Sequence, residues 1–214
     1  MDSAKTWRET VLDSLRLLGL FLLLSLLSVL LHELGHCVFY WAQGIPAGMS
    51  LVKEYPLRDI SELEYAIGSA GGPLSNILQL AVAVFWVHRW RPDPPRRTWA
   101  LAFVLANVCY FIVRSGIAVL SGDGGELTDA ASLFGLDYRS AILLFLVLSA
   151  GALIWTTRAA HIRITPKVVL KLPGLLVLYF IFLVAVQTLD RALFWERFPT
   201  IEIGEDRLYN QRVP

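Results

Sequence analysis

The sequence predicts an all-α fold, a polytopic bundle of transmembrane helices with about five spans. Three observations lead to this prediction. The 214-residue chain is 56% hydrophobic and only 17% charged, with a mean hydropathy of +0.56, which is too apolar for an ordinary soluble domain. Long apolar segments recur with short polar connections, and the tryptophans gather near the segment ends. We therefore expect an integral, multi-pass membrane protein in contact with the lipid bilayer.

Each apolar segment is long enough, or nearly so, to cross a bilayer, whose core of about 30 Å needs roughly 20 apolar residues per helix. The segments run from about 11 to 42, 64 to 88, 98 to 120, 140 to 157 and 168 to 193. Tryptophan prefers the headgroup depth, and core aromatics of a soluble bundle would instead be scattered along the helices. The tryptophans at or near segment ends are Trp7, Trp41, Trp86, Trp90, Trp99, Trp155 and Trp195.

The spans divide the chain into parts of one membrane domain, residues 1–214. We expect a three-helix core carrying the candidate site over residues 11–130. Two additional helices occupy residues 138–194, and a polar C-terminal tail occupies residues 195–214.

The first apolar segment follows basic residues, as the core of a signal peptide does. It is too long for that role, and no small-residue cleavage site closes it, so we expect it to stay in the mature protein. The two cysteines, Cys37 and Cys109, lie within predicted spans and are expected to be free packing thiols. A formal net charge of +1 gives no reason to expect a nucleic-acid partner.

The stretch SVLLHELGHCVFY, residues 28–40, places three ionisable residues inside the first segment. His32 and His36 are four residues apart, so on a helix they share a face and can reach one tetrahedral metal ion. Glu33 lies next to that face, as in the His-Glu-x-x-His arrangement in which two histidines hold zinc and the glutamate handles a proton of water. Each ionisable side chain at bilayer depth costs about 2.5 to 3.5 kcal/mol, which favours a metal site over plain core histidines.

Two histidines leave a catalytic zinc one protein ligand short. The segment SGDGGELTD, residues 121–129, follows the third span directly and carries Asp123, Glu126 and Asp129. Asp123 is the favoured ligand, because glycine on both sides lets its carboxylate approach a metal with little steric conflict. The alternative is a solvated loop in which Asp123 or Asp129 caps the following helix.

Together these motifs resemble the site-2 protease family of intramembrane zinc metalloproteases. The resemblance covers roughly residues 20–130 and consists of HELGH in one transmembrane helix, GGPLSN (residues 71–76) in the next, and Asp-Gly at residues 123–124 after a third. It implies His32, His36 and Asp123 as zinc ligands and Glu33 as the general base.

The second span has a small-residue face, because Gly68, Gly72 and Asn76 recur every four residues and permit close helix packing. In the family, the element that matches Gly72 and Asn76 borders the active site. The resemblance therefore implies that these two residues bind substrate, with Asn76 bonding its backbone or the oxyanion; a polar contact between helices is the alternative for Asn76. The family usually also has an asparagine and a proline shortly before Asp-Gly, whereas the nearest upstream asparagine here is Asn107.

The segment IPAGMSLVKEYPLRDI, residues 45–60, mixes alternating apolar positions with Pro46, Gly48 and Pro56. It is too short and too broken to span a membrane. We expect a short interfacial or re-entrant hairpin beside the site, with an ordinary solvated loop as the alternative.

These observations predict a zinc-dependent endopeptidase that hydrolyses peptide bonds in or near transmembrane segments of membrane proteins. One alternative is a membrane zinc-binding protein without protease activity, such as a carrier or scaffold, for which Glu33 is not required. Another is a membrane zinc protease of the prenyl-protein-processing type. That family pairs His-Glu-x-x-His with a downstream Glu-x-x-x-His, a spacing that this sequence lacks.

Overall fold

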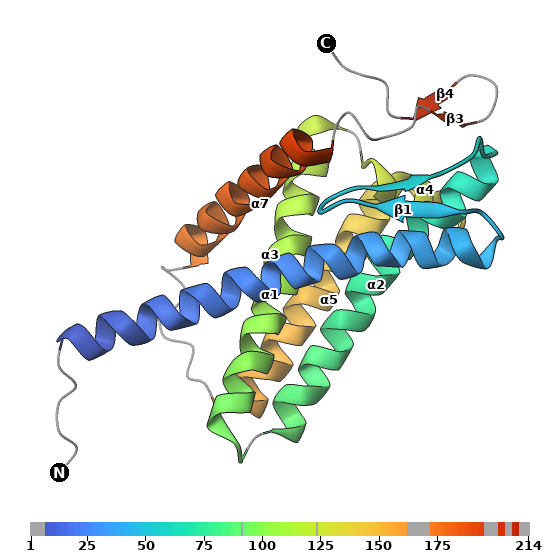
Figure 1. Cartoon of the computed structure of the whole chain (residues 1–214). Coiled ribbons are helices and arrows are strands. Elements are labelled where there is room, and N and C mark those ends of the chain that lie inside the picture. The colour runs from blue at the N-terminus through green and yellow to red at the C-terminus, as the bar shows by residue number, and fades with distance from the viewer. Residues whose placement is uncertain are drawn as a thin grey trace.

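The computed structural model describes residues 7–90, 92–122, 124–161, 172–194, 201–203 and 207–209. In Figure 1, α1 crosses α2 and α3 at a steep angle, while α2, α3 and α5 run alongside one another. In chain order the elements are α1 (Trp7–Ala42), β1 (Ala47–Met49), β2 (Glu54–Pro56), α2 (Glu62–Arg89), α3 (Pro94–Ser121), α4 (Glu126–Ser132), α5 (Tyr138–Ala159), α7 (Leu172–Phe194), β3 (Ile201–Ile203) and β4 (Arg207–Tyr209).

Five of these helices, α1, α2, α3, α5 and α7, are long and apolar enough to cross a membrane. Their bounds agree with the predicted spans to within a few residues, and the all-α, multi-pass prediction is confirmed. Six of the seven tryptophans lie near helix ends as expected, and Trp195 lies outside the described residues.

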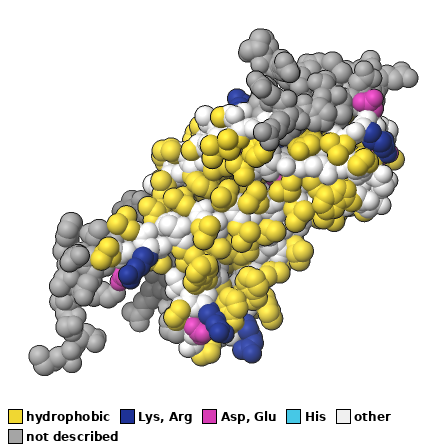
Figure 2. Space-filling view, viewed as in Figure 1, with side chains coloured by type: hydrophobic (Ala, Val, Ile, Leu, Met, Phe, Trp, Pro, Cys, Tyr) yellow, Lys and Arg dark blue, Asp and Glu magenta, His cyan; other side chains and the backbone are white. Residues whose placement is uncertain are grey.

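The outer surface of the helices is apolar. Figure 2 shows hydrophobic side chains covering the middle of one face, with the acidic and basic side chains gathered toward its ends. A soluble protein rarely exposes so large a continuous apolar surface, whereas a lipid-facing surface requires one. Exposed examples on four of the long helices are Leu23, Leu78, Phe85, Leu143 and Ile181.

Polar residues begin the inner helices at defined positions. At the start of α2, Ser61 and Glu64 form a reciprocal capping box, in which each side chain accepts a hydrogen bond from the other residue's backbone N–H. Asp93 caps α3, in which proline occupies the first helical position, where its missing N–H costs nothing. Asp137 caps α5 by accepting from the backbone N–H of Ser140. These caps satisfy backbone donors that would otherwise be left unpaired.

Helices α1 and α2 approach closely because glycines face each other where they cross. A Cβ atom added to Gly35 would lie 2.5 Å from the backbone oxygen of Gly71, and one added to Gly68 would overlap the Tyr40 ring. The predicted small-residue face is therefore confirmed, because Gly68, Gly72 and Asn76 are all buried against α1. This contact places the backbone of α2 directly beside the histidines of α1.

Residues 45–60 form the predicted hairpin, because β1 and β2 pair antiparallel with Gly48 opposite Tyr55. The hairpin packs on the end of α1, where Trp41 Nε1 donates to the Ala47 carbonyl at 3.1 Å. The alternative expectation, an ordinary solvated loop, is wrong for this segment, since Pro56 and Ile60 are buried. Its position at the membrane surface stays a prediction.

Helix α7 is joined to the hairpin by a buried carboxylate. Asp190 accepts hydrogen bonds from Ser50 Oγ at 2.9 Å and from the Leu51 backbone nitrogen at 2.6 Å. Within the predicted tail, β3 and β4 pair antiparallel, and Ile203 bridges to Ile60. The hairpin thus connects α1, α7 and part of the tail.

Candidate metal centre

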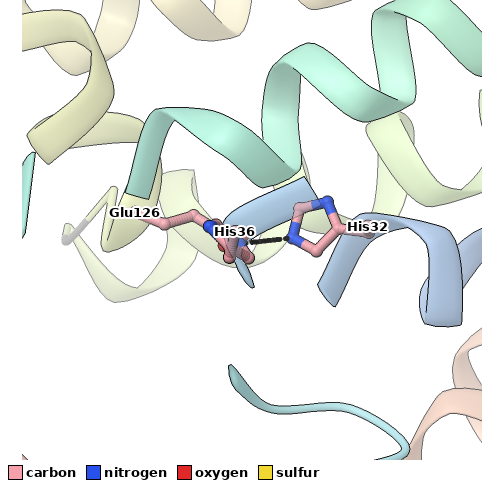
Figure 3. Close-up of side chains that lie close together, drawn as sticks. All are labelled: His32, His36 and Glu126. Atoms are coloured by element: carbon pink, nitrogen blue, oxygen red, sulfur yellow. Dashed lines mark hydrogen bonds and ion pairs between the residues drawn. The ribbon is translucent and has the colours of Figure 1, made fainter. Parts of the chain in front are cut away.

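Helix α1 supplies two buried imidazoles from successive turns. His32 and His36 are 2% and 0% exposed, and their Nε2 atoms lie 3.1 Å apart. Figure 3 shows the two rings side by side, with Glu126 reaching toward them. The predicted shared face is therefore present, and both rings direct the same nitrogen to one point.

Helix α2 fixes the orientation and protonation of both rings. His36 Nδ1 lies 2.9 Å from the Gly68 carbonyl oxygen, and His32 Nδ1 makes a short hydrogen bond to Asn76 Oδ1. A carbonyl oxygen can only accept, so His32 Nδ1 carries the hydrogen. His36 Nδ1 lies between an acceptor, the Gly68 carbonyl oxygen, and a donor, the Gly72 backbone N–H at 3.2 Å, and the shorter contact to Gly68 favours hydrogen on this Nδ1 as well. Each Nε2 is then left with a lone pair, which is the state in which a neutral imidazole binds a metal.

The Oε2 atom of Glu126 forms a triangle with the Nε2 atoms of His32 and His36. This oxygen lies 3.1 Å from His32 Nε2 and 3.0 Å from His36 Nε2. The turn from α3 into α4 places it there, using Gly122 and Gly125 at φ of 70° and 50°. L side chains rarely adopt such conformations, so the turn requires glycine.

The triangle has the dimensions of a zinc site. Tetrahedral ligands held about 2.1 Å from zinc lie roughly 3.4 Å apart, and the three atoms lie 3.0 to 3.1 Å apart. Two imidazole nitrogens and one carboxylate oxygen are also the donor types that zinc prefers in catalytic sites. These residues therefore fit a zinc ion, with a fourth position left for water or substrate.

The charges of the triangle also favour a cation. With hydrogen on both Nδ1 atoms, two lone pairs and a carboxylate oxygen face one another. Among the described residues, the Tyr110 hydroxyl, 3.1 Å from His32 Nε2, can donate to this group. Buried acceptors without donors are costly, so a cation between them would remove that cost.

Glu126 is held as a carboxylate. Burial alone would raise the pKa of Glu126, but the guanidinium of Arg114, with which it forms an ion pair, lowers that pKa well below its ordinary value. Arg114 Nη2 makes the ion pair through Glu126 Oε1, which leaves Oε2 for the triangle. The carboxylate is therefore ionised at neutral pH, as a metal ligand must be.

The third ligand predicted from sequence, Asp123, lies outside the described residues, so its assignment stays a prediction. Glu126, from the same acidic segment, is the carboxylate that the structure brings to the histidines. The sequence prediction ranked it below Asp123 on the strength of the flanking glycines. Its position shortly after a third span that carries Arg114 was the signal that could have raised its rank.

Gly72 and Asn76 both lie at the histidines, but on the side of the rings that faces α2. The backbone nitrogen of Gly72 lies 3.2 Å from His36 Nδ1, and a Cβ atom there would overlap both rings. Asn76 is fully buried and bonds His32, while its Nδ2 atom has no hydrogen-bond partner among the described residues. Both residues support the rings, and their predicted contact with substrate stays a prediction.

Glu33 has the position expected of a proton acceptor. It is 5% exposed, and its Oε2 atom has no hydrogen-bond partner in the described part of the chain. Oxygens of Glu33 and Glu54 and a ring nitrogen of His36 all lie within 4.8 Å of one another. Glu33 and Glu126 both line a cavity of about 270 Å³, which α7 also lines with Phe180, Leu183, Val184 and Gln187.

Three further residues of the site were not found from the sequence. Tyr110 and Arg114 lie one turn apart on α3, with the Arg114 guanidinium 6.0 Å from the Tyr110 ring centre, and Glu54 comes from β2. Each also lines the cavity. An arginine far from both ends of an apolar helix was the available signal for Arg114, whereas Glu54 carried no signal at all.

Comparisons of the chain with protein-family models, with curated proteins and with solved structures found no match.

Proposed function

We propose that the chain is an intramembrane zinc metalloprotease, which hydrolyses peptide bonds in or near transmembrane segments of membrane proteins. His32, His36 and Glu126 hold the zinc ion, and Glu33 is the general base. The motifs HELGH, GGPLSN and Asp-Gly, which resemble the site-2 protease family, support the same proposal. Asp123 remains the ligand that this resemblance implies, and it is tested against Glu126 below.

One observation carries the proposal. Three ligand atoms of the types that zinc prefers converge to about 3 Å, and the carboxylate of Glu33, whose Oε2 atom has no hydrogen-bond partner in the described part of the chain, stands beside them at a cavity. A carrier or scaffold needs the ligands but has no use for this fourth group. A buried carboxylate oxygen without a partner is costly, and a proton-transfer role accounts for it.

The chemistry follows from these positions. Zinc, when bound, supplies a Lewis acid that polarises water and a peptide carbonyl. Glu33 accepts the proton of the attacking water and delivers it to the leaving amine. Asn76 and the Gly68 carbonyl keep both imidazoles aimed at one point, so the ligands need no rearrangement during the reaction.

The hydrogen bonds of a helix limit the form in which a substrate is cut. Peptide carbonyls in an intact helix are sheltered by their own hydrogen bonds. We therefore infer that a transmembrane substrate is cut in a locally unwound segment.

The test compares Glu33→Gln with the parent in detergent-purified protein. The substitution keeps shape and hydrogen bonding but removes the proton acceptor, so we expect about one zinc per chain in both proteins and cleavage at least 10²- to 10⁴-fold slower in the variant. The assay is cleavage of a reporter whose transmembrane helix contains unwinding residues, with zinc quantified on the same preparations.

Two controls make the result specific. Glu62→Gln makes the same change at an exposed position on α2 and should cleave like the parent. His36→Ala should lose zinc and activity together. Equal cleavage by the parent and Glu33→Gln would refute the mechanism. A zinc-loaded parent that cleaves no membrane substrate would favour the carrier or scaffold.

A further inference from the structure

Arg114 is an arginine within the third candidate span, and its surroundings explain its place there. It lies seven residues before the end of α3, or about 10 Å along the helix axis. A guanidinium at membrane depth is expensive, and such residues usually face the protein interior and pair with another group. Here the partner is Glu126, which belongs to the candidate metal centre.

The two oxygens of Glu126 have different partners. Oε1 pairs with Arg114 Nη2, whereas Oε2 faces the Nε2 atoms of His32 and His36. A glutamate has three rotatable bonds, and fixing them costs conformational entropy. An ion pair to one oxygen holds the other in place before any metal arrives.

Other contacts keep Arg114 itself in position. Its guanidinium lies over the ring of Tyr110, one turn earlier on the same helix, a favourable arrangement for a cation and an aromatic face. Tyr110 in turn places its hydroxyl 3.1 Å from His32 Nε2. One face of α3 thus supports both the carboxylate and an imidazole of the triangle.

We propose that Arg114 is the positioning residue that holds Glu126 as a one-oxygen ligand for zinc. The proposal rests on the zinc site proposed above. It concerns metal binding and does not require Arg114 to touch the substrate.

The sign of the effect separates positioning from simple electrostatics. A positive charge near a metal site repels the metal, so Coulomb's law alone predicts that removing Arg114 would tighten zinc binding. If Arg114 positions Glu126, its removal weakens binding, by about the 10- to 100-fold typical when a residue that orients a ligand is lost. The two explanations therefore predict opposite results.

The experiment measures zinc affinity by competition with a chelating dye in purified, full-length protein. We expect Arg114→Gln to bind zinc 10- to 100-fold more weakly than the parent and Arg114→Lys, which keeps the charge, to recover most of that loss. Arg96→Gln is the matched control, since Arg96 on the same helix also pairs with an acidic residue, Asp93, at 3.2 Å. Its zinc affinity should equal that of the parent.

A spectroscopic arm tests whether Arg114 acts through Glu126. With Co²⁺ in place of zinc, the visible absorption reports the ligand geometry, and we expect Arg114→Gln to change it. In a Glu126→Gln background at saturating Co²⁺, Arg114→Gln should add no further change. A further change there would overturn the proposal, as would unchanged or tighter zinc binding by folded Arg114→Gln.

The outcomes also separate this proposal from the proposed function. If the parent and Arg114→Gln bind zinc equally while His36→Ala does not, the zinc site stands and only the role of Arg114 is wrong. If the parent binds no zinc, both proposals fail. Should Arg114→Gln not fold, the Co²⁺ spectrum of Arg114→Lys decides, because a lysine reaches Glu126 with a different geometry. A spectrum that differs from the parent's, but not in the Glu126→Gln background, supports positioning, and a spectrum identical to the parent's overturns it.

Discussion

The substitution Gly72→Ala tests the geometry of the metal centre with a single added methyl group. A Cβ atom at this position would lie 2.5 Å from His32 Cε1 and 2.6 Å from His32 Nε2, and it would also overlap His36 Nε2. Non-bonded carbon atoms prefer separations of about 3.5 to 4.0 Å, so the rings must move by roughly 1 Å. Metal–ligand distances tolerate only about 0.2 Å. We therefore expect zinc affinity to fall at least 10- to 100-fold.

The control for Gly72→Ala is Gly151→Ala, the same change in the interior of α5. A Cβ atom on Gly151 meets no atom within 4 Å, so this variant should bind zinc like the parent and gain up to about 1 kcal/mol in stability from the better helix former. The assays are zinc competition with a chelating dye and thermal unfolding followed by circular dichroism. Parent-like zinc affinity in a folded Gly72→Ala protein would refute the placement of α2 against the histidines.

Two further predictions concern individual groups around the triangle. Because Glu126 Oε2 lies 3.0 and 3.1 Å from the two Nε2 atoms, Glu126→Ala should lower zinc content strongly in elemental analysis; loss of zinc in Asp123→Ala alone would make Asp123 the ligand instead. Tyr110→Phe should keep zinc but lower kcat roughly 10²- to 10³-fold in the reporter assay, because its hydroxyl, 3.1 Å from His32 Nε2, is close enough to the ligand atoms to donate to an oxyanion that forms beside them. Unchanged kcat in that variant would make Tyr110 a packing residue.

The sequence predicted what depends on local pattern. Span positions follow from the length of apolar segments, and the shared face of His32 and His36 follows from their four-residue spacing on a helix. The small-residue face of α2 was also predictable, because Gly68, Gly72 and Asn76 recur at helical spacing. Each of these features is fixed within one element, so knowledge of the neighbouring elements adds little to it.

The contacts between elements could not be predicted in the same way. The hydrogen bond between His32 Nδ1 and Asn76 Oδ1 depends on the register of α1 against α2. The close approach of Gly35 and Gly71 sets that register. The choice of Glu126 depends on the direction in which the glycine turn after α3 points α4. Glu54 reaches Glu33 only because the hairpin folds back onto α1. No spacing in the sequence encodes these distances.

The charges around the cavity give an argument for a cation that does not depend on ligand geometry. The acidic and basic side chains that line it are Glu33, Glu54, Glu126 and Arg114. Three carboxylates and one guanidinium sum to a formal charge of −2 when all are ionised, and to −1 when Glu33 and Glu54, which form a hydrogen bond, share a proton. In either state the cavity carries an excess of negative charge, which is costly in a low-dielectric interior and which a bound cation compensates. The same balance explains why Arg114 can stay beside a metal ion: without its positive charge, Glu126 would be a third uncompensated carboxylate whenever the metal was absent.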